Sequence, residues 1–152
     1  MALPKPGWIT LYLELVSHVF YRNDPTLTFV GAVGAGLTFK VFEWQSVAAA
    51  RVLAARATLP SVEEQEAWET DRMAVKGDGP AFAVINPEFK TYFEELRQIA
   101  GEPQEGTPGR PLLPFNQKWV DDFNSGHERR KRCGDGKTVL PRSSYRDLFQ
   151  HA

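Results

Sequence analysis

Apolar residues recur close to helical spacing over residues 39–57 and 87–100 and more loosely over residues 61–75, where a capping box precedes them, and we predict a helix over each stretch. None of the three has a glycine in its interior, and the third carries a complete apolar face. The members of that face are Phe89, Tyr92, Phe93, Leu96 and Ile99. A fourth helix is predicted over residues 117–130. This pattern predicts a mainly α fold.

The residues at the helix ends indicate where each helix starts. Thr38 is the expected N-cap of the first helix, because a threonine hydroxyl can accept a hydrogen bond from an amide of the first turn. Ser61 and Glu64 have the spacing of a capping box. Asn86 followed by Pro87 predicts the N-cap and the first position of the third helix. The apolar positions expected for the first helix are Phe39, Phe42, Ala49, Val52 and Leu53.

One short β-hairpin is expected before the first helix. Residues 26–30 alternate polar and apolar β-formers and stop at Gly31. We expect residues 18–21 to pair with them, whereas residues 8–22 as a whole show no consistent period. Because a hairpin cannot form the open parallel sheet of a nucleotide-binding domain, no complete Rossmann sheet is expected.

Composition along the chain predicts three parts. Residues 1–101 hold the hairpin and three helices, and residues 102–116, rich in proline and glycine, are predicted to be an extended linker. Residues 117–152 are predicted to be a helix followed by a loose basic tail. We expect the linker and the last twenty residues to be the most mobile parts.

Overall composition narrows the class of protein. The 152 residues are 42% hydrophobic with a formal net charge of -1, which suits one globular domain and argues against attraction to nucleic acid or to anionic membranes. No apolar run reaches the ~18–20 residues that a membrane span needs. The N-terminal stretch is a poor match to a signal peptide, and a single cysteine, Cys133, excludes an internal disulfide. A cytoplasmic location is therefore expected.

The glycine-rich segment GAVGAG at residues 31–36 is the main candidate for ligand binding. Glycines between a strand and a helix let backbone N–H groups approach a phosphate at the positive end of the helix. The spacing is G-x-x-G-x-G, however, and differs from the G-x-G-x-x-G of a dinucleotide-binding fingerprint. The residues alone leave two interpretations open, a simple corner or a binding element.

Other polar clusters favour structural interpretations. The histidines are too far apart in sequence to form a ligand-spaced metal motif: His18, His127 and His151. Neither Ser46 nor Cys133 lies in a nucleophile motif. The acidic residues of 63–71 and the basic run 129–132 are typical of solvated helix surfaces. We predict no catalytic residue and no metal site in this chain.

Several short motifs follow one another in a specific order between residues 18 and 101. A strand ending in a glycine precedes a helix that carries a glutamine, an alanine-rich stretch, a basic residue and Leu-Pro-Ser. These positions are Phe29-Val30-Gly31, Gln45, Ala48 to Ala50, Arg56 and Leu59-Pro60-Ser61. In this order they resemble the C-terminal part of flavin-containing monooxygenases of the fungal, dimethylaniline-monooxygenase-like type. The resemblance implies a fragment of a flavoprotein with two dinucleotide-binding domains.

That resemblance implies an FAD- and NADPH-dependent monooxygenase that oxygenates soft nitrogen or sulfur nucleophiles. It also implies a set of cofactor-binding residues at the N-terminal end of the first helix: Gly36, Leu37, Thr38, Phe39 and Gln45. Because both glycine fingerprints are missing, we expect the chain to be catalytically incomplete and to retain neither cofactor alone. Its expected partner is the missing N-terminal catalytic half. The alternative is a small helical interaction module, derived from the same segment, that binds a partner or self-associates.

Overall fold

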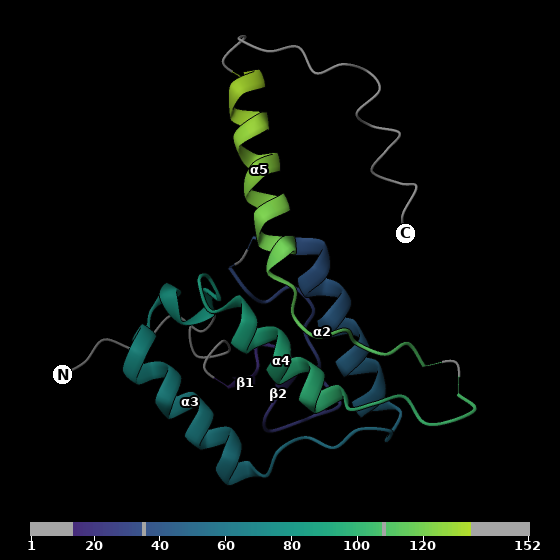
Figure 1. The fold of residues 1–152 in the computed structure, drawn as a ribbon. Coiled ribbons are helices and arrows are strands. Elements are labelled where there is room, and N and C mark those ends of the chain that lie inside the picture. The colour runs from purple at the N-terminus through teal and green to yellow at the C-terminus, as the bar shows by residue number, and fades with distance from the viewer. Residues whose placement is uncertain (1–13, 35, 108, 135–152) are drawn as a thin grey trace, which may run out of the picture. The chain divides into compact units, whose positions relative to one another are not determined.

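A computed structural model describes residues 14–34, 36–107 and 109–134 of the chain. These residues belong to two compact units that divide after Asn116, and each is described by itself. The first unit holds a hairpin, three α-helices and one 3-10 turn (Figure 1). Its elements are β1 Leu15–Val16, β2 Phe20–Tyr21, α2 Thr38–Leu53, α3 Val62–Lys76, η1 Pro80–Ala83 and α4 Phe89–Ala100. The predicted mainly α fold with an N-terminal hairpin is confirmed.

The hairpin lies earlier in the chain than expected. β1 and β2 pair antiparallel around the three-residue turn 17–19. Its first two residues, Ser17 and His18, have positive φ, 47° and 56°, the left-handed geometry that is common in tight hairpin turns. The expected pairing of residues 18–21 with 26–30 is confirmed in part. Thr28 forms an isolated antiparallel bridge with Phe20, and on either side of it the Tyr21 N–H donates to the Leu27 carbonyl at 3.1 Å and the Phe29 N–H to the Val19 carbonyl at 2.7 Å.

Burial explains why the sequence pattern missed these strands. All of residues 15–20 are buried, including the three residues of the turn. A strand that is half buried alternates apolar and polar residues, but a segment that is buried on both faces does not. The lack of a period around residues 15–20 therefore reflects their burial, and the strand Leu15–Val16 was not predicted.

α2 starts where it was expected, but its cap is different. The N-cap is Leu37, with φ 59° and ψ 33°, and no side chain caps the helix. Thr38 lies inside the helix, so the prediction that it caps the helix was wrong. α2 ends at Leu53 rather than near residue 57, and Ala55 beyond it has φ 53°, a left-handed conformation that turns the chain away.

The buried face of α2 includes Ala49, as predicted, but otherwise differs from the predicted face. Its core residues are Val41, Trp44, Gln45, Ala48, Ala49 and Arg51. Phe39 is instead 88% exposed and Phe42 37% exposed. The pattern of bulky residues pointed to the wrong side, because α4 packs on the alanine-bearing side of α2, where small side chains allow close approach.

α3 and α4 begin with different local structures. The capping box of α3 is confirmed, since the Glu64 N–H donates to Ser61 Oγ at 3.3 Å and the Ser61 N–H donates to Glu64 Oε2 at 2.8 Å. α4 begins at Phe89 with Glu88 as its N-cap. The Asn86–Pro87 peptide bond is cis and forms a turn before the helix, so their predicted places in it were wrong. The predicted apolar face is buried at Phe89, Tyr92, Phe93 and Leu96.

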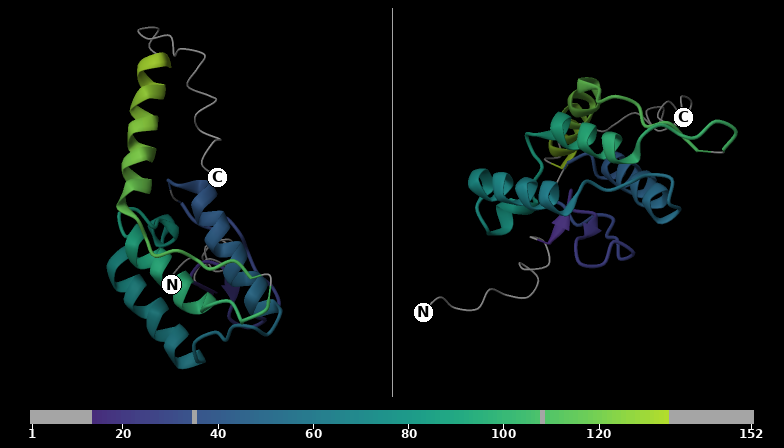
Figure 2. Two further views of the ribbon diagram at one scale, coloured as in Figure 1. Left: turned by 45° about the vertical axis from the view of Figure 1, so that its right-hand side comes forward. Right: turned by 90° about the horizontal axis from the view of Figure 1, so that it is seen from below.

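The core of the first unit lies between α2, α3, α4 and the hairpin. The hairpin lies on the side of α2 and α3 that faces away from α4 (Figure 2, right). Trp44 of α2 meets Phe93 of α4 edge to face, with ring centroids 5.5 Å apart. The other large side chains that are fully buried include Phe20, Phe82, Leu15, Ile85 and Leu96. This packing fixes the position of the loop that leads into α2.

The segment after α4 has no helix or strand in its described residues up to Asn116. Its later part is nevertheless attached to the first unit, because Leu112 is buried and the Phe115 N–H donates to Glu94 Oε1 at 2.7 Å. The Arg51 guanidinium donates to the carbonyl oxygens of Gly101 and Arg110. The greater mobility of this linker stays a prediction.

The second unit contributes one described helix, α5 Gln117–Gly134. It confirms the fourth predicted helix and extends it beyond residue 130. Lys118 pairs with Asp122 at 2.6 Å one turn along the helix, and the rings of Phe123 and His127 stack. The predicted loose tail falls mainly on residues 135–152, outside the described residues. No helix in the described part of either unit has the length and apolar character to cross a membrane.

His18 is the most unusual group of the first unit. Its side chain is fully buried among the rings of Trp68, Phe82 and Tyr92, with centroids 5.4 to 6.2 Å away. Neither ring nitrogen has a hydrogen-bond partner among the described residues. Burial, together with the nearby positive charge of Arg72, lowers the pKa of His18 from 6.5 to about 3. The folded chain therefore holds this imidazole neutral.

We predict that the free energy of unfolding falls as the pH drops below 6.5. The unfolded chain binds a proton at His18 that the folded chain excludes, so acid favours unfolding until the pH nears 3. Between pH 7 and pH 5 the loss should be about 2 kcal/mol. Urea denaturation at both pH values measures it. His18→Asn keeps a residue that tolerates positive φ but has no imidazole to titrate. This variant should be less stable than the unchanged protein at pH 7, but its free energy of unfolding should fall much less between pH 7 and pH 5. Equal losses in both proteins would contradict this assignment.

Candidate functional site

The glycine-rich loop at residues 31–36 is held by internal hydrogen bonds. The Gly34 N–H donates to the Ala83 carbonyl at 2.9 Å, and the Gly34 carbonyl accepts from the Ile85 N–H at 3.2 Å. The Gly31 N–H donates to Gln45 Oε1 at 2.7 Å. These two glycine amides are thus used within the fold, and they are not available to a phosphate.

Gly31 is also required for steric reasons. Its φ is 92°, which side chains rarely adopt, and a Cβ there would lie 2.9 Å from a ring carbon of Phe42. The corner at Gly31 is therefore a structural feature in its own right. The first part of the loop therefore matches the interpretation of a simple corner, and not that of a binding element.

The N-terminal end of α2 is the part of the candidate site that remains accessible. Thr38 and Phe39 are exposed, and Leu37 has no side-chain oxygen with which to cap their amides. The first amides of a helix have no acceptor within the helix and carry partial positive charge. Gly36, Leu37, Thr38 and Phe39 are adjacent here, so this end has the chemistry to receive an anionic group through its backbone.

Gln45 lies apart from the other predicted cofactor-binding residues. Its side chain is fully buried, and its Nε2 donates to the Tyr92 hydroxyl at 2.6 Å. The Tyr92 hydroxyl in turn donates to the Ser17 carbonyl at 2.9 Å. Through this chain of hydrogen bonds Gln45 joins the Gly31 corner, α4 and the hairpin turn. A role for Gln45 toward a cofactor stays a prediction, and its contacts in this structure are with the protein core.

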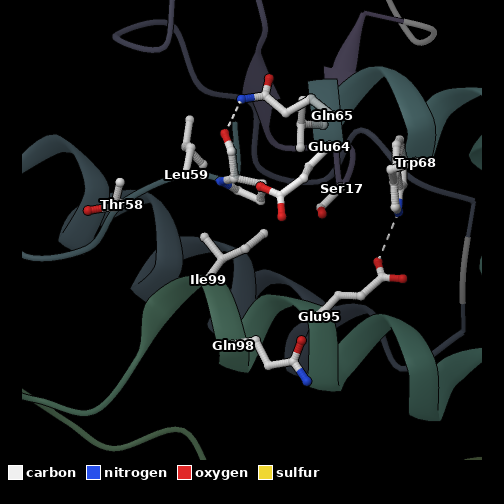
Figure 3. Close-up of a pocket in the computed structure, with 11 residues that line it drawn as sticks. Ser17, Thr58, Leu59, Glu64, Gln65, Trp68, Glu95, Gln98 and Ile99 are labelled. Carbon is white, nitrogen blue, oxygen red and sulfur yellow. Dashed lines mark hydrogen bonds between the residues drawn. The ribbon is translucent and has the colours of Figure 1, made fainter. Parts of the chain in front are cut away.

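A separate pocket of about 410 Å³ lies between α3, α4 and the chain that enters α3 (Figure 3). One wall is apolar, with Leu59, Pro60 and Ile99, and Glu64 reaches into it from α3. Its remaining lining residues are Val16, Ser17, Thr58, Gln65, Trp68, Glu95 and Gln98. Its lining, as described, holds no histidine, cysteine, lysine or arginine, and its polar groups are hydroxyls, amides, the Trp68 indole and the two carboxyl groups of Glu64 and Glu95.

Glu95 is the titratable group of this pocket with a resolved perturbation. Burial raises the pKa of Glu95, and the hydrogen bond from Trp68 Nε1 at 3.2 Å and the charge of Arg72 oppose that rise. Such a carboxylate can accept hydrogen bonds, and the other acid of the pocket, Glu64, bonds the Ser61 N–H in the capping box of α3. Among the described residues no group of three His, Cys, Asp or Glu side chains is placed to hold a metal ion.

Two curated proteins of Aspergillus flavus match the chain over most of its length. Flavin-containing monooxygenase ustF2 is 32% identical over 108 residues, which are 71% of this chain and 22% of that protein. Flavin-containing monooxygenase ustF1 is 35% identical over 103 residues, 68% of this chain and 26% of that protein. The chain is a flavin-containing-monooxygenase-like segment. No protein-family model matches it.

The monooxygenase-like segment spans about a quarter of the length of the curated relatives that it matches. The resemblance seen in the order of short motifs is thereby confirmed. It applies to a segment, because most of each relative has no counterpart in this chain.

Sequence reasoning missed the partners that hold the candidate site in place. Tyr92 was assigned only to an apolar face, although its hydroxyl bonds Gln45 and Ser17. Arg51 was not singled out, although it is buried and donates to three carbonyl oxygens beyond α2. The sequence did contain one signal for each residue: Tyr92 is a tyrosine among phenylalanines, and Arg51 is an arginine inside an alanine-rich stretch. Their partners lie far away in sequence and left no local signal.

We predict that Tyr92→Phe in the monooxygenase-like segment lowers the free energy of unfolding by about 1–3 kcal/mol. The change removes one hydroxyl and leaves Gln45 Nε2 and the Ser17 carbonyl without that partner inside the core. Chemical denaturation measures the loss without any cofactor present. The matched control is Tyr21→Phe, whose hydroxyl accepts only the exposed Asn23 amide at 3.3 Å and should matter by less than about 0.5 kcal/mol. Equal effects of the two substitutions would disprove the role given to this network.

Proposed function

We propose that the chain is the C-terminal portion of an FAD- and NADPH-dependent monooxygenase that oxygenates soft nitrogen or sulfur nucleophiles. Similarity to two flavin-containing monooxygenases over about a quarter of their length carries this proposal. The described residues supply helices and one hairpin, and they offer no sheet on which a complete dinucleotide site could be built. The portion is therefore proposed to be catalytically incomplete by itself. Its proposed location is the cytoplasm.

The proposed contact with FAD is the N-terminal end of α2. The uncapped amides at Thr38 and Phe39 fit a negatively charged group, and Gly36 and Leu37 lead into them. FAD when bound supplies the oxygen chemistry, with NADPH as reductant, and the residues of this chain would bind and orient. Gln45 would act on this end indirectly, by holding the Gly31 corner through its hydrogen bond.

A helix N-terminus is too weak to hold a dinucleotide alone. It contributes about 0.3–2 kcal/mol toward an anion, whereas micromolar affinity requires about 8 kcal/mol. The glycine amides that might have added to it are bonded to Ala83 and Gln45. The remaining binding energy must therefore come from another part of the enzyme.

We predict that the purified 152-residue chain neither retains FAD nor oxidises NADPH. Absorbance near 450 nm and the flavin released on denaturation measure retention, and loss of absorbance at 340 nm measures NADPH oxidation. The expected flavin content is far below one per chain, because one helix end supplies only part of the affinity. A yellow chain with near-stoichiometric flavin would show that it is not an incomplete fragment. A homodimer combining two half-sites at Gly36, Thr38 and Phe39 would then be the explanation.

The second candidate function is a helical interaction module that reuses this segment to bind a partner or itself. The 88% exposure of Phe39 favours it, because a large apolar side chain in water marks an interaction surface when others adjoin it. A module would bind its partner with equal affinity whether or not flavin is present. The incomplete enzyme requires instead that flavin is retained when the rest of the polypeptide is joined to it.

A further inference from the structure

Arg72 of α3 holds a short stretch of backbone next to the glycine-rich loop, residues 82–86, which we name the bridging segment. The Arg72 Nε donates to the Phe82 carbonyl at 2.7 Å, and the Arg72 Nη2 donates to the Val84 carbonyl at 3.0 Å. These two donors lie on one edge of the planar guanidinium. A single side chain of α3 therefore fixes two carbonyl oxygens of the bridging segment at once.

The intervening backbone groups of the bridging segment bond the glycine-rich loop. The Ala83 carbonyl accepts from the Gly34 N–H at 2.9 Å, and the Ile85 N–H donates to the Gly34 carbonyl at 3.2 Å. Gly34 and Val84 form a parallel bridge there. A Cβ at Gly34 would lie 3.3 Å from Val84 Cγ2, so the loop and the bridging segment approach closely. The bridging segment thus connects α3 to the loop through backbone hydrogen bonds.

Two aromatic rings keep the Arg72 guanidinium in place. Its central carbon lies 5.7 Å from the centroid of the Trp68 ring and 5.5 Å from that of the Phe82 ring. A cation beside aromatic rings is attracted to them and is partly screened from water, which strengthens its hydrogen bonds. Lys76, one turn further along α3, adds a longer bond of 3.4 Å to the Asn86 carbonyl. Both cations of α3 thus contact the same stretch of backbone.

The position of Gly34 bears on how the chain enters α2. Gly36 follows two residues later, and Leu37, the N-cap, has φ 59° and no side-chain cap. The first amides of a helix have no acceptor within it, so a loop that moved freely could fold back and cover them. The bonds at Gly34 hold this loop in the course that leaves Thr38 and Phe39 exposed.

We propose that Arg72 is a positioning residue for the flavin contact at the N-terminal end of α2. This inference rests on the proposed function. Arg72 acts through the bridging segment, which fixes Gly34 and thereby preorganises the loop before the helix. A preorganised site spends less binding energy on ordering its own backbone. Flavin affinity therefore depends on an arginine that belongs to a different helix from the one that contacts the cofactor.

The first test measures amide hydrogen exchange in the isolated chain. Arg72→Met keeps an apolar side chain beside the two rings and removes the donors. It should speed exchange of the Gly34 and Ile85 amides about tenfold relative to that of the Leu96 amide, which lies in the buried part of α4. Arg72→Lys should have a smaller effect, because an ammonium group can still reach one of the carbonyls.

The matched control for this test is Arg22→Met. Arg22 also contacts α3, where it pairs with Glu69. Its substitution removes an arginine contact of the same helix and leaves the bonds of Arg72 in place, so the exchange ratio should change by less than about twofold. If R72M leaves exchange at Gly34 and Ile85 unchanged, or speeds it only as much as exchange at Leu96, the inference is wrong.

The second test measures flavin binding in a full-length hybrid protein, flavin-containing monooxygenase ustF1 with its matching segment replaced by this chain. FAD is titrated into the flavin-free hybrid, and the change in flavin fluorescence gives Kd. R72M should raise Kd about tenfold, R72K should raise it less, and R22M should raise it by less than about twofold. A purely structural role of Arg72 would instead lower the denaturation midpoints of R72M and R22M and leave both Kd values unchanged.

The outcomes separate this inference from the proposed function. A hybrid that unfolds cooperatively but binds no flavin would contradict the proposed function, and the inference would fall with it. Flavin that binds equally well to the unchanged hybrid and to R72M would support the proposed function and overturn the inference alone. The exchange measurement on the isolated chain can overturn the inference even if the hybrid does not fold.

Discussion

The Gln45 side chain is the constraint on which the arrangement of the first unit depends. Its amide is buried, and it both accepts from the Gly31 N–H and donates to the Tyr92 hydroxyl. Tyr92 passes the connection to the Ser17 carbonyl in the hairpin turn. An amide inside a core is costly unless both of its ends are satisfied, so only one mutual placement of corner, hairpin, α2 and α4 is favourable. The loop that leads to the N-terminal end of α2 is held by the same bonds.

The two sides of α2 differ in what packs against them. Trp44, Phe93 and Leu96 form a close-packed interior, and the buried face of α2 carries small residues that let α4 approach. On the outward side of the same helix, Phe39, Phe42 and Leu53 are exposed. The helix therefore departs from the usual pattern of a surface helix, whose outward side is polar or charged.

Local signals predicted the helices well and the tertiary contacts poorly. The capping box of Ser61 and the apolar face of α4 depend on residues that are close in sequence, and both are as predicted. The predicted cap at Thr38 was wrong by one residue, most of the predicted face of α2 was wrong, and the strand at Leu15 was missed. Burial explains the last of these, because a segment buried on both faces lacks the period that marks a strand. Within the candidate site, the sequence located the N-terminal end of α2 correctly. It contained no local signal that Gln45 is buried. Its partner Tyr92 lies 47 positions away.

Arg51 has a different consequence for how the segment tolerates change. Its guanidinium holds the end of α4 and the chain beyond it through the backbone carbonyls of Ala100, Gly101 and Arg110, and it uses no side chain of that stretch. Any residue supplies a carbonyl oxygen, so these three bonds do not depend on the side chains of their acceptors. The arginine itself has no substitute, since lysine offers no planar fork with which to reach several acceptors at once. What limits change between Gly101 and Arg110 is instead the backbone, because Gly101 and Gly106 have positive φ and a Cβ at Gly109 would lie 2.9 Å from Pro103.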